Sequence, residues 1–306
     1  MKKLSVILPA YNEQEMLDST AKTLTSLLDQ EGIGFELIFV DDGSTDLTWA
    51  KIRQASALDE RIRGIRFSRN FGKEAAIFAG LAEAAGDCAA VMDCDLQHPP
   101  GTLVEMYRLW EQGYEVVEAV KRSRGKETFL HRLGAGSFYR LMSMATRIDM
   151  SRASDFKLMD RKAVDALMAM PEKGAFFRAL SSWVGFSQIQ VEFDVQERQA
   201  GQSKWSTGAL IGYALRNITG FTTLPLHLVT GAGVVVFVMA VLLSIQTLLR
   251  YATGHAVEGF TTVILLILLI GSVMMISLGI IGYYLARIYQ EIQGRPRYII
   301  KEKIRG

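Results

Sequence analysis

Two uncharged stretches near the end of the chain constrain its fold more than any other feature. Leu224 to Leu249 contains one titratable residue, His227, and Phe260 to Ala286 contains no charged residue. Each stretch exceeds the roughly 20 residues that cross about 30 Å of hydrocarbon. A buried helix of a soluble protein is the alternative, but such helices are seldom so long and uncharged. We therefore predict two transmembrane helices.

The charges around these stretches predict their orientation. Only the ten residues from Arg250 to Gly259 separate them, so the helices are expected to form an antiparallel hairpin. The segment after the second stretch is rich in cations, namely Arg287, Arg295, Arg297, Lys301, Lys303 and Arg305, whereas the linking loop has one arginine. The positive-inside rule then places both ends of the hairpin, and the rest of the chain, in the cytoplasm. The first apolar run, Leu4 to Ala10, is too short for a cleavable signal peptide.

The first hundred residues alternate short apolar runs with segments of helical spacing. The apolar runs are Leu4–Pro9, Phe35–Val40, Ile62–Phe67 and Cys88–Met92. This alternation predicts right-handed crossovers and a mostly parallel sheet covered by helices on both faces. In such sheets ligands bind outside the carboxyl ends of the strands. The polar groups that fall at those ends are Tyr11, Asp41-Asp42, Asn70–Lys73 and Asp93–Asp95.

Asp93-Cys94-Asp95 is the candidate metal site. Side chains two residues apart in an extended segment point the same way, so these carboxylates are expected to converge. Converging carboxylates repel each other unless a cation lies between them, and hard oxygen ligands suit Mg²⁺ or Mn²⁺, which hold phosphate oxygens. A polar turn with two solvated aspartates is the alternative. The polar groups at the neighbouring strand ends favour the metal site.

Composition narrows the classes of partner and compartment. A net charge of +2 gives no support for nucleic-acid binding. The two cysteines, Cys88 and Cys94, lie next to a predicted strand, which favours a reducing compartment over a structural disulfide. Residues 129–148 and 210–221 mix apolar, aromatic and basic side chains. They are expected to be helices that lie in a membrane interface or pack on a neighbouring surface.

Five motifs together carry a family resemblance. They are Leu8–Glu13, Val40–Asp46, Arg69–Lys73, Met92–Pro100 and the polar loop Arg198–Trp205. In order and spacing the chain resembles family 2 glycosyltransferases of the GT-A fold, a Rossmann-like α/β fold. Within that family it is most similar to polyisoprenyl-phosphate glycosyltransferases such as bactoprenol glucosyltransferases and dolichol-phosphate mannose synthases. Processive polysaccharide synthases fit less well, because a third long span and a Gln-x-x-Arg-Trp motif are both absent from the sequence.

The resemblance implies a division of the chain. Residues 1–200 would form the GT-A domain, 201–222 an active-site loop and interfacial helix, 223–289 the two transmembrane helices and 290–306 a basic cytoplasmic tail. It also implies a multi-pass protein of the bacterial plasma membrane with both termini in the cytoplasm. A homo-oligomer and a separate flippase are further partners that it implies.

The resemblance also implies roles for individual residues. Those expected at the nucleotide are Pro9, Tyr11, Glu13, Asp41, Asp42 and Lys73, with Tyr11 stacking on the base. The metal would be held by Asp93, Asp95 and Gln97. Asp95 and Asp155 are the candidate catalytic residues, with Asp155 near the acceptor as a positioner or a weak base. The candidates for binding the acceptor phosphate or the donor diphosphate are Arg122, Arg132, Arg198, Ser203 and Lys204. The alternative for each is a side chain that simply faces solvent or the membrane surface.

The implied activity is inverting transfer of a single hexose from a nucleotide sugar to undecaprenyl phosphate, with Mg²⁺ or Mn²⁺, at the cytoplasmic membrane face. Subgroup resemblance favours UDP-glucose as donor, with GDP-mannose, UDP-N-acetylglucosamine and UDP-amino-arabinose derivatives as alternatives. A non-catalytic membrane scaffold would have no need of the acidic pairs. Asp41, Asp42, Asp93 and Asp95 are all present, which favours an enzyme.

Overall fold

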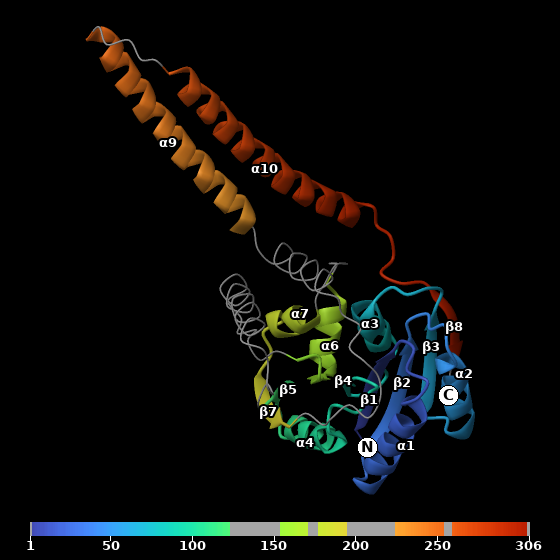
Figure 1. Cartoon of the computed structure of the whole chain (residues 1–306). Coiled ribbons are helices and arrows are strands. Elements are labelled where there is room, and N and C mark those ends of the chain that lie inside the picture. The colour runs from blue at the N-terminus through green and yellow to red at the C-terminus, as the bar shows by residue number, and fades with distance from the viewer. Residues whose placement is uncertain (1, 123–153, 171–176, 195–223, 254–258, 305–306) are drawn as a thin grey trace. The chain divides into compact units, whose positions relative to one another are not determined.

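The computed structural model describes residues 2–122, 154–170, 177–194, 224–253 and 259–304 (Figure 1). The chain divides into two compact units. The first comprises Met1–Ile211 together with Pro296–Gly306, and the second comprises Gly212–Arg295.

The first unit is built on one mixed sheet in the order β7-β5-β6-β4-β1-β2-β3-β8. Its strands are β1 (Lys3–Ala10), β2 (Gly34–Asp41), β3 (Ile62–Phe67), β4 (Cys88–Val91), β5 (Val116–Lys121), β6 (Lys157–Asp160), β7 (Gln188–Phe193) and β8 (Ile300–Ile304). Pairings β1–β2, β1–β4, β2–β3 and β5–β7 are parallel, and the other three between these strands are antiparallel. The predicted α/β architecture is confirmed.

Six helices of the described residues accompany this sheet. They are α1 (Leu17–Gln30), α2 (Thr48–Leu58), α3 (Lys73–Glu83), α4 (Pro100–Glu111), α6 (Arg161–Met168) and α7 (Phe177–Trp183). Pro100 lies at the first position of α4, where its missing N–H costs no hydrogen bond. The same proline pair therefore ends the loop after β4 and starts the next helix.

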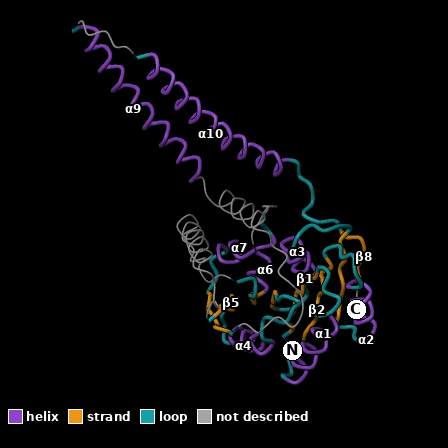
Figure 2. The backbone as a smooth tube through the Cα atoms, viewed as in Figure 1, coloured by secondary structure: helices purple, strands orange, loops and turns teal. Residues whose placement is uncertain are grey.

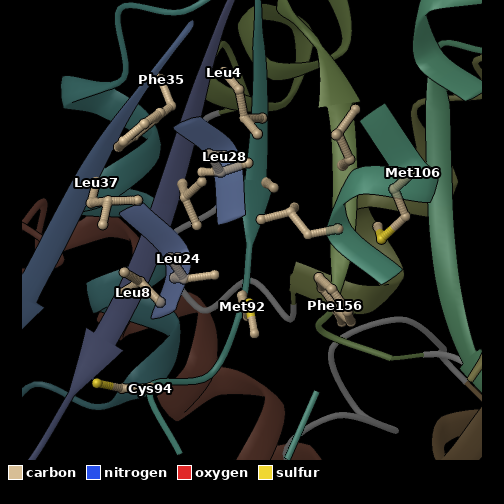
Figure 3. Packing of buried hydrophobic residues seen from close by; sticks show 14 of the residues in the cluster. Leu4, Leu8, Leu24, Leu28, Phe35, Leu37, Met92, Cys94, Met106 and Phe156 are labelled. Atoms are coloured by element: carbon tan, nitrogen blue, oxygen red, sulfur yellow. The ribbon is translucent and has the colours of Figure 1, made fainter. Parts of the chain in front are cut away.

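Helices cover both faces of the sheet because its central strands are apolar on both sides. One cluster joins Leu4 and Leu8 of β1 to Leu24 of α1 and Met106 of α4 (Figure 3). On the opposite face, alternate residues of β2 and β3 pack against Ala76 and its neighbours on α3. Side chains of successive strand residues point to opposite faces, so β2 and β3 each contribute to both clusters. The packing fixes the carboxyl ends of β1, β2 and β4 at one edge.

The chain returns to this sheet at its carboxyl end. Strand β8 pairs antiparallel with β3, and Glu302 accepts a hydrogen bond from Trp49 Nε1 at 2.7 Å. Tyr298 stacks on Phe67 with ring centroids 5.0 Å apart. The sequence predicts a basic tail over residues 290–306. In the structure the last helix ends at Ile292, and Ile300–Ile304 completes the sheet of the first unit.

The second unit contains the two long helices α9 (Leu224–Ala252) and α10 (Phe260–Ile292), which contact each other (Figure 2). Large apolar side chains on both are exposed, including Phe237 and Met275. Of the residues that the structure describes, Leu269–Ile292 is the one stretch long and apolar enough to cross a membrane. Val229–Leu243 in α9 is a shorter apolar segment.

Candidate active site

The loops after β1 and β2 are tied together by hydrogen bonds. Asn12 has a positive φ of 54°, and its backbone N–H donates to Ser44 Oγ at 2.9 Å. Its side-chain oxygen accepts from the backbone N–H of Thr45 at 2.9 Å. Beside this junction Tyr11 is 38% exposed, so part of the residue is accessible to solvent.

Asp41 and Asp42, at the end of β2, bind the protein's own backbone. Asp41 is fully buried and accepts a hydrogen bond from the N–H of Ser44 at 2.8 Å. Asp42 accepts from the N–H groups of Phe71 and Gly72 at 2.6 and 2.9 Å. Burial raises the pKa of Asp42, and these two hydrogen bonds reduce that rise. The structure therefore places both carboxylates at the carboxyl end of β2, where they hold the backbone of the loops that follow β2 and β3.

Gly43 makes this close approach of loops feasible. Its φ is +69°, and a Cβ there would lie 2.5 Å from the carbonyl carbon of Arg69. Only glycine meets both conditions without strain. The Val40–Asp46 and Arg69–Lys73 motifs are thus packed against each other at the carboxyl edge of the sheet.

A charged cluster lies at the neighbouring strand ends. Lys73, the first residue of α3, places its Nζ 2.6 Å from Asp93 Oδ1 and 2.9 Å from Asp155 Oδ2. Asp155 precedes β6 and also accepts two hydrogen bonds from Arg178 of α7, at 2.6 Å from Nε and 2.9 Å from Nη2. Four side chains from four segments therefore alternate in charge, in the order Asp93, Lys73, Asp155 and Arg178. Three of them, Lys73, Asp93 and Asp155, were predicted as site residues, and the structure brings them together.

Each charge in this cluster stabilises the ionised form of its neighbours. Burial would raise the pKa of Asp155 and Asp93, but neighbouring side chains together lower both pKa values below the ordinary range, Lys73 and Arg178 at Asp155 and Lys73 and His98 at Asp93. Burial would likewise lower the pKa of Lys73, and the two carboxylates raise it instead. All three groups are ionised at neutral pH. A carboxylate with a low pKa is a weak base.

Two members of the site were not predicted. Arg178 lies in an apolar helix, and its bidentate bond to Asp155 depends on tertiary contacts that no motif displays. Glu74 accepts a hydrogen bond from the N–H of Phe177 at 2.8 Å, which links α3 to α7. Burial, with the nearby Asp155 charge, raises the pKa of Glu74 to about 7. Its place directly after Lys73 is the one signal in the sequence that could have found it.

Asp95 and Gln97 lie in a turn after β4. The strand ends at Val91, and Leu96 has a positive φ of 53°, so the extended geometry assumed for Asp93-Cys94-Asp95 does not continue through Asp95. Asp95 Oδ1 accepts from the backbone N–H of Gln97 at 3.1 Å. The Asp95 residue is 8% exposed, whereas the Asp93 side chain is 32% exposed and binds Lys73. The two carboxylates therefore have different partners and different access to solvent.

The donor set is suited to a hard cation that brings its own ligands. Within the described residues no three His, Cys, Asp or Glu side chains form a group that could hold a metal. Asp93 and Asp95 offer oxygen atoms, and the cation already bound to Asp93 is the Lys73 ammonium. Mg²⁺ and Mn²⁺ sites that use one or two carboxylates complete their shell with water and substrate phosphates. The residues fit an ion that arrives with a diphosphate.

Arg122 is the one described member of the predicted acceptor-binding set. It is exposed and lies 3.1 Å from Asp194 and 3.6 Å from Glu192, outside the Lys73 cluster. Arg132, Arg198, Ser203 and Lys204 fall outside the described residues, as do the predicted interfacial segments 129–148 and 210–221. Cys88 and Cys94 are both buried and free, as expected for a chain without a structural disulfide.

Comparison with known proteins identifies the family. The model of glycosyl transferase family 2 matches residues 5–168. This range contains the carboxyl ends of strands β1 to β6. The chain belongs to glycosyl transferase family 2. A bactoprenol glucosyl transferase of Shigella phage SfII is 35% identical over 309 residues, covering 99% of each chain. An uncharacterised glycosyltransferase of Bacillus subtilis, YkcC, is 40% identical over 300 residues, covering 97% of this chain and 93% of the relative.

Solved structures share the fold of this chain. Glucosyl-3-phosphoglycerate synthase from Mycobacterium tuberculosis, in complex with Mn²⁺, UDP and phosphoglyceric acid, aligns with a TM-score of 0.54 and 20% identity. The alignment covers 71% of this chain and 76% of that one. The same synthase with Mg²⁺ and UDP gives a TM-score of 0.51, also at 20% identity, over 71% and 77% of the two chains. This likeness establishes the GT-A fold.

Proposed function

We propose that this glycosyltransferase transfers a single glucose from UDP-glucose to a polyprenyl phosphate at the cytoplasmic face of the bacterial plasma membrane. The observation that carries the proposal is the charge cluster of Asp93, Lys73, Asp155 and Arg178 at the carboxyl ends of the strands. The near full-length relatives named bactoprenol glucosyl transferase support glucose and a polyprenyl acceptor.

Donor binding would use the loops after β1 and β2 together with Asp93. Tyr11 offers an exposed ring for the uracil, beside the loops that Asp41 and Asp42 hold in place. A Mg²⁺ or Mn²⁺ ion held by Asp93 and Asp95 would neutralise the charge that develops on the departing diphosphate. Lys73, whose Nζ lies 2.6 Å from Asp93 Oδ1, would supply a further positive charge on the same side of the site.

The acceptor phosphate is already ionised, so transfer needs orientation more than a strong base. An acceptor oxygen forms a bond to the anomeric carbon as the bond from that carbon to the diphosphate oxygen breaks, and its electron pair leaves with UDP. Attack opposite the leaving group inverts the anomeric centre. Asp155 has a depressed pKa and two bonds to Arg178, which suits a residue that positions a guanidinium rather than one that removes a proton.

Chain connectivity supports a membrane hairpin. Strand β8 follows α10 and belongs to the same sheet as the residues before α9, so the chain between them must cross a bilayer an even number of times. If α10 crosses, a second crossing is required, and α9 is the other long apolar helix of the described residues. Its 29 residues would extend about 44 Å, more than the hydrocarbon core requires. Exposed apolar side chains on both helices are the surface that lipid would cover.

A donor and acceptor panel tests the proposal. Purified enzyme in lipid nanodiscs is given Mg²⁺ or Mn²⁺ and one of four donors: UDP-glucose, UDP-N-acetylglucosamine, GDP-mannose or a UDP-amino-arabinose. The acceptor is undecaprenyl phosphate or, as the matched control, undecaprenol. Mass spectrometry should find one hexose on the phosphate with UDP-glucose and no product on the alcohol. Product from another donor would reassign the sugar, and transfer to the alcohol or polymer growth would overturn the proposed acceptor.

A further inference from the structure

A second ion pair is buried directly behind the Asp155–Arg178 pair. Glu118 of β5 and Lys157 of β6 are register partners across the two antiparallel strands, with Lys157 Nζ 3.1 Å from Glu118 Oε1. Their side chains are 3% and 0% exposed. Removing two charges from water costs free energy that their attraction only partly returns, and apolar replacements of such pairs are often neutral or stabilising. Stability alone is therefore a weak explanation for this pair.

The carboxylate of this pair binds the backbone next to Asp155. Glu118 Oε1 accepts a hydrogen bond from the N–H of Ser154 at 3.1 Å, and Oε2 accepts from Gln188 Nε2 at 2.7 Å. Ser154 immediately precedes Asp155, and its Oγ in turn accepts from the N–H of Phe156 at 3.1 Å. The residue that carries the site carboxylate is thus held from both sides through Ser154.

The ammonium of the pair binds the helix that carries Arg178. Lys157 Nζ donates to Ser181 Oγ at 2.9 Å, to Ser182 Oγ at 3.0 Å and to the carbonyl of Arg178 at 3.4 Å. Both hydroxyls donate to that same carbonyl, at 3.2 and 3.1 Å. The backbone of Arg178 is therefore tied to Lys157 directly and through two serines.

We infer that Glu118 and Lys157 are positioning residues for the transfer reaction. One member holds the backbone beside Asp155, the other holds the backbone of Arg178, and the bond between them sets the distance between the two. Neither side chain reaches the substrate, because both are buried beneath the site. Displacements of about 1 Å in an oriented reaction can lower the rate roughly 100-fold, so a link of this kind matters for catalysis. The inference rests on the proposed function for its kinetic part alone.

The test replaces the pair without leaving a lone buried charge. Glu118→Gln/Lys157→Met keeps an acceptor for Ser154 and the volume of the lysine, but removes the donor to α7. We expect kcat to fall at least about tenfold, with KM for UDP-glucose within twofold and the unfolding temperature little changed. The control is Lys3→Met/Glu36→Gln at the amino ends of β1 and β2, which removes the pair joined at 3.0 Å together with the contact of Glu36 with Arg63 at 3.1 Å, while Arg63 keeps Glu83 at 3.5 Å. It should leave kcat unchanged.

A mutant cycle separates positioning from general structure. If Lys157 acts through Arg178, adding the double replacement to Arg178→Ala should cause little further loss of kcat, because the group it positions is already gone. Full additivity of the two effects would contradict the inference. So would an unchanged kcat in a folded Glu118→Gln/Lys157→Met enzyme. If that variant does not fold, Ser181→Ala/Ser182→Ala removes the uncharged links and should lower kcat by several-fold, and an unchanged kcat there would equally contradict it.

A spectroscopic arm keeps this inference distinct from the proposed function. In protein labelled with ¹⁵N-arginine, the Nε–H signal of Arg178, assigned by its loss in Arg178→Lys, should exchange slowly with water because it binds Asp155. The Glu118→Gln/Lys157→Met replacement should speed that exchange at least about tenfold, and the control pair should not. Wild-type enzyme that transfers no sugar would overturn the proposed function and still leave this result to decide the positioning. Unchanged exchange would overturn the positioning alone.

Discussion

The two sets of carboxylates at the carboxyl edge of the sheet are held by different kinds of partner. Asp41 and Asp42 accept hydrogen bonds from the backbone N–H groups of Ser44, Phe71 and Gly72, and Asp41 Oδ2 also lies 3.3 Å from Arg66 Nε. Asp93 and Asp155 bind the side-chain ammonium of Lys73. Backbone donors are fixed by the fold, whereas a lysine side chain can rotate away when another cation arrives. We therefore expect the first set to hold the loops in place, and Asp93 of the second set to be able to exchange Lys73 for another cation.

Chelation should separate the two sets most strongly. Excess EDTA is expected to abolish transfer, because the charge on the leaving diphosphate then lacks its metal. The unfolding temperature should stay within about 2 °C of its starting value, since Lys73 compensates Asp93 and Asp155 without a metal. Product formation by mass spectrometry and thermal unfolding of the same sample measure both effects. Full activity in chelator would remove metal from the mechanism.

Asp93→Asn should lower transfer at least about 100-fold with little effect on stability. Asparagine keeps the shape of the side chain but loses the charge that attracts a cation, and Lys73 retains Asp155 as its partner. Steady-state kinetics and thermal unfolding give the two quantities. The matched control is Glu83→Gln, at the opposite end of α3, which also breaks a carboxylate–lysine contact of 2.6 Å. Similar losses in both variants would show that Asp93 acts through the fold.

In contrast to Asp93→Asn, Asp42→Asn should mainly lower the stability of the protein. One of the two backbone N–H groups of Phe71 and Gly72 would face an amide NH₂ in place of an acceptor, which costs about 1–3 kcal/mol of unfolding free energy. Denaturant titration of the purified protein measures it. Stability equal to wild type, together with loss of donor binding, would place Asp42 among the substrate ligands instead.

Glu74→Gln should change the free energy of unfolding least of these variants, and the change should depend on pH. The pKa of Glu74 rises on folding from 4.5 to about 7, so between these values the unfolded chain releases a proton that the folded protein keeps. Stability contributed at this residue therefore falls as pH rises through that window and stays low above it. Glutamine keeps an acceptor for Phe177 and should flatten the profile, with a gain of about 1 kcal/mol at pH 8. An unchanged profile from pH 4.5 to 8 would contradict the assignment.

The sequence predicted those parts of the site that local patterns determine. Alternating apolar runs located β1 to β4, and the polar residues after them brought Lys73, Asp93 and Asp155 to one place. The sequence does not predict the contact of Arg178 with Asp155, because that contact depends on where α7 packs. Strand β8 escaped because Ile-Lys-Glu-Lys-Ile lacks the alternation of a half-buried strand. Whether a carboxylate faces a loop or a ligand, as for Asp42 and Asp93, depends on backbone donors that sequence does not display.

Metal binding, measured apart from catalysis, tests most directly whether the second set of carboxylates is the exchangeable one. Electron paramagnetic resonance can titrate free Mn²⁺ against the enzyme in the presence of UDP. We expect wild-type protein to bind the ion, Asp93→Asn to bind at least about 10-fold more weakly, and folded Asp42→Asn to bind within about threefold of wild type. Equal binding by wild type and Asp93→Asn, or loss of binding confined to Asp42→Asn, would contradict the exchange of Lys73 for a metal at Asp93.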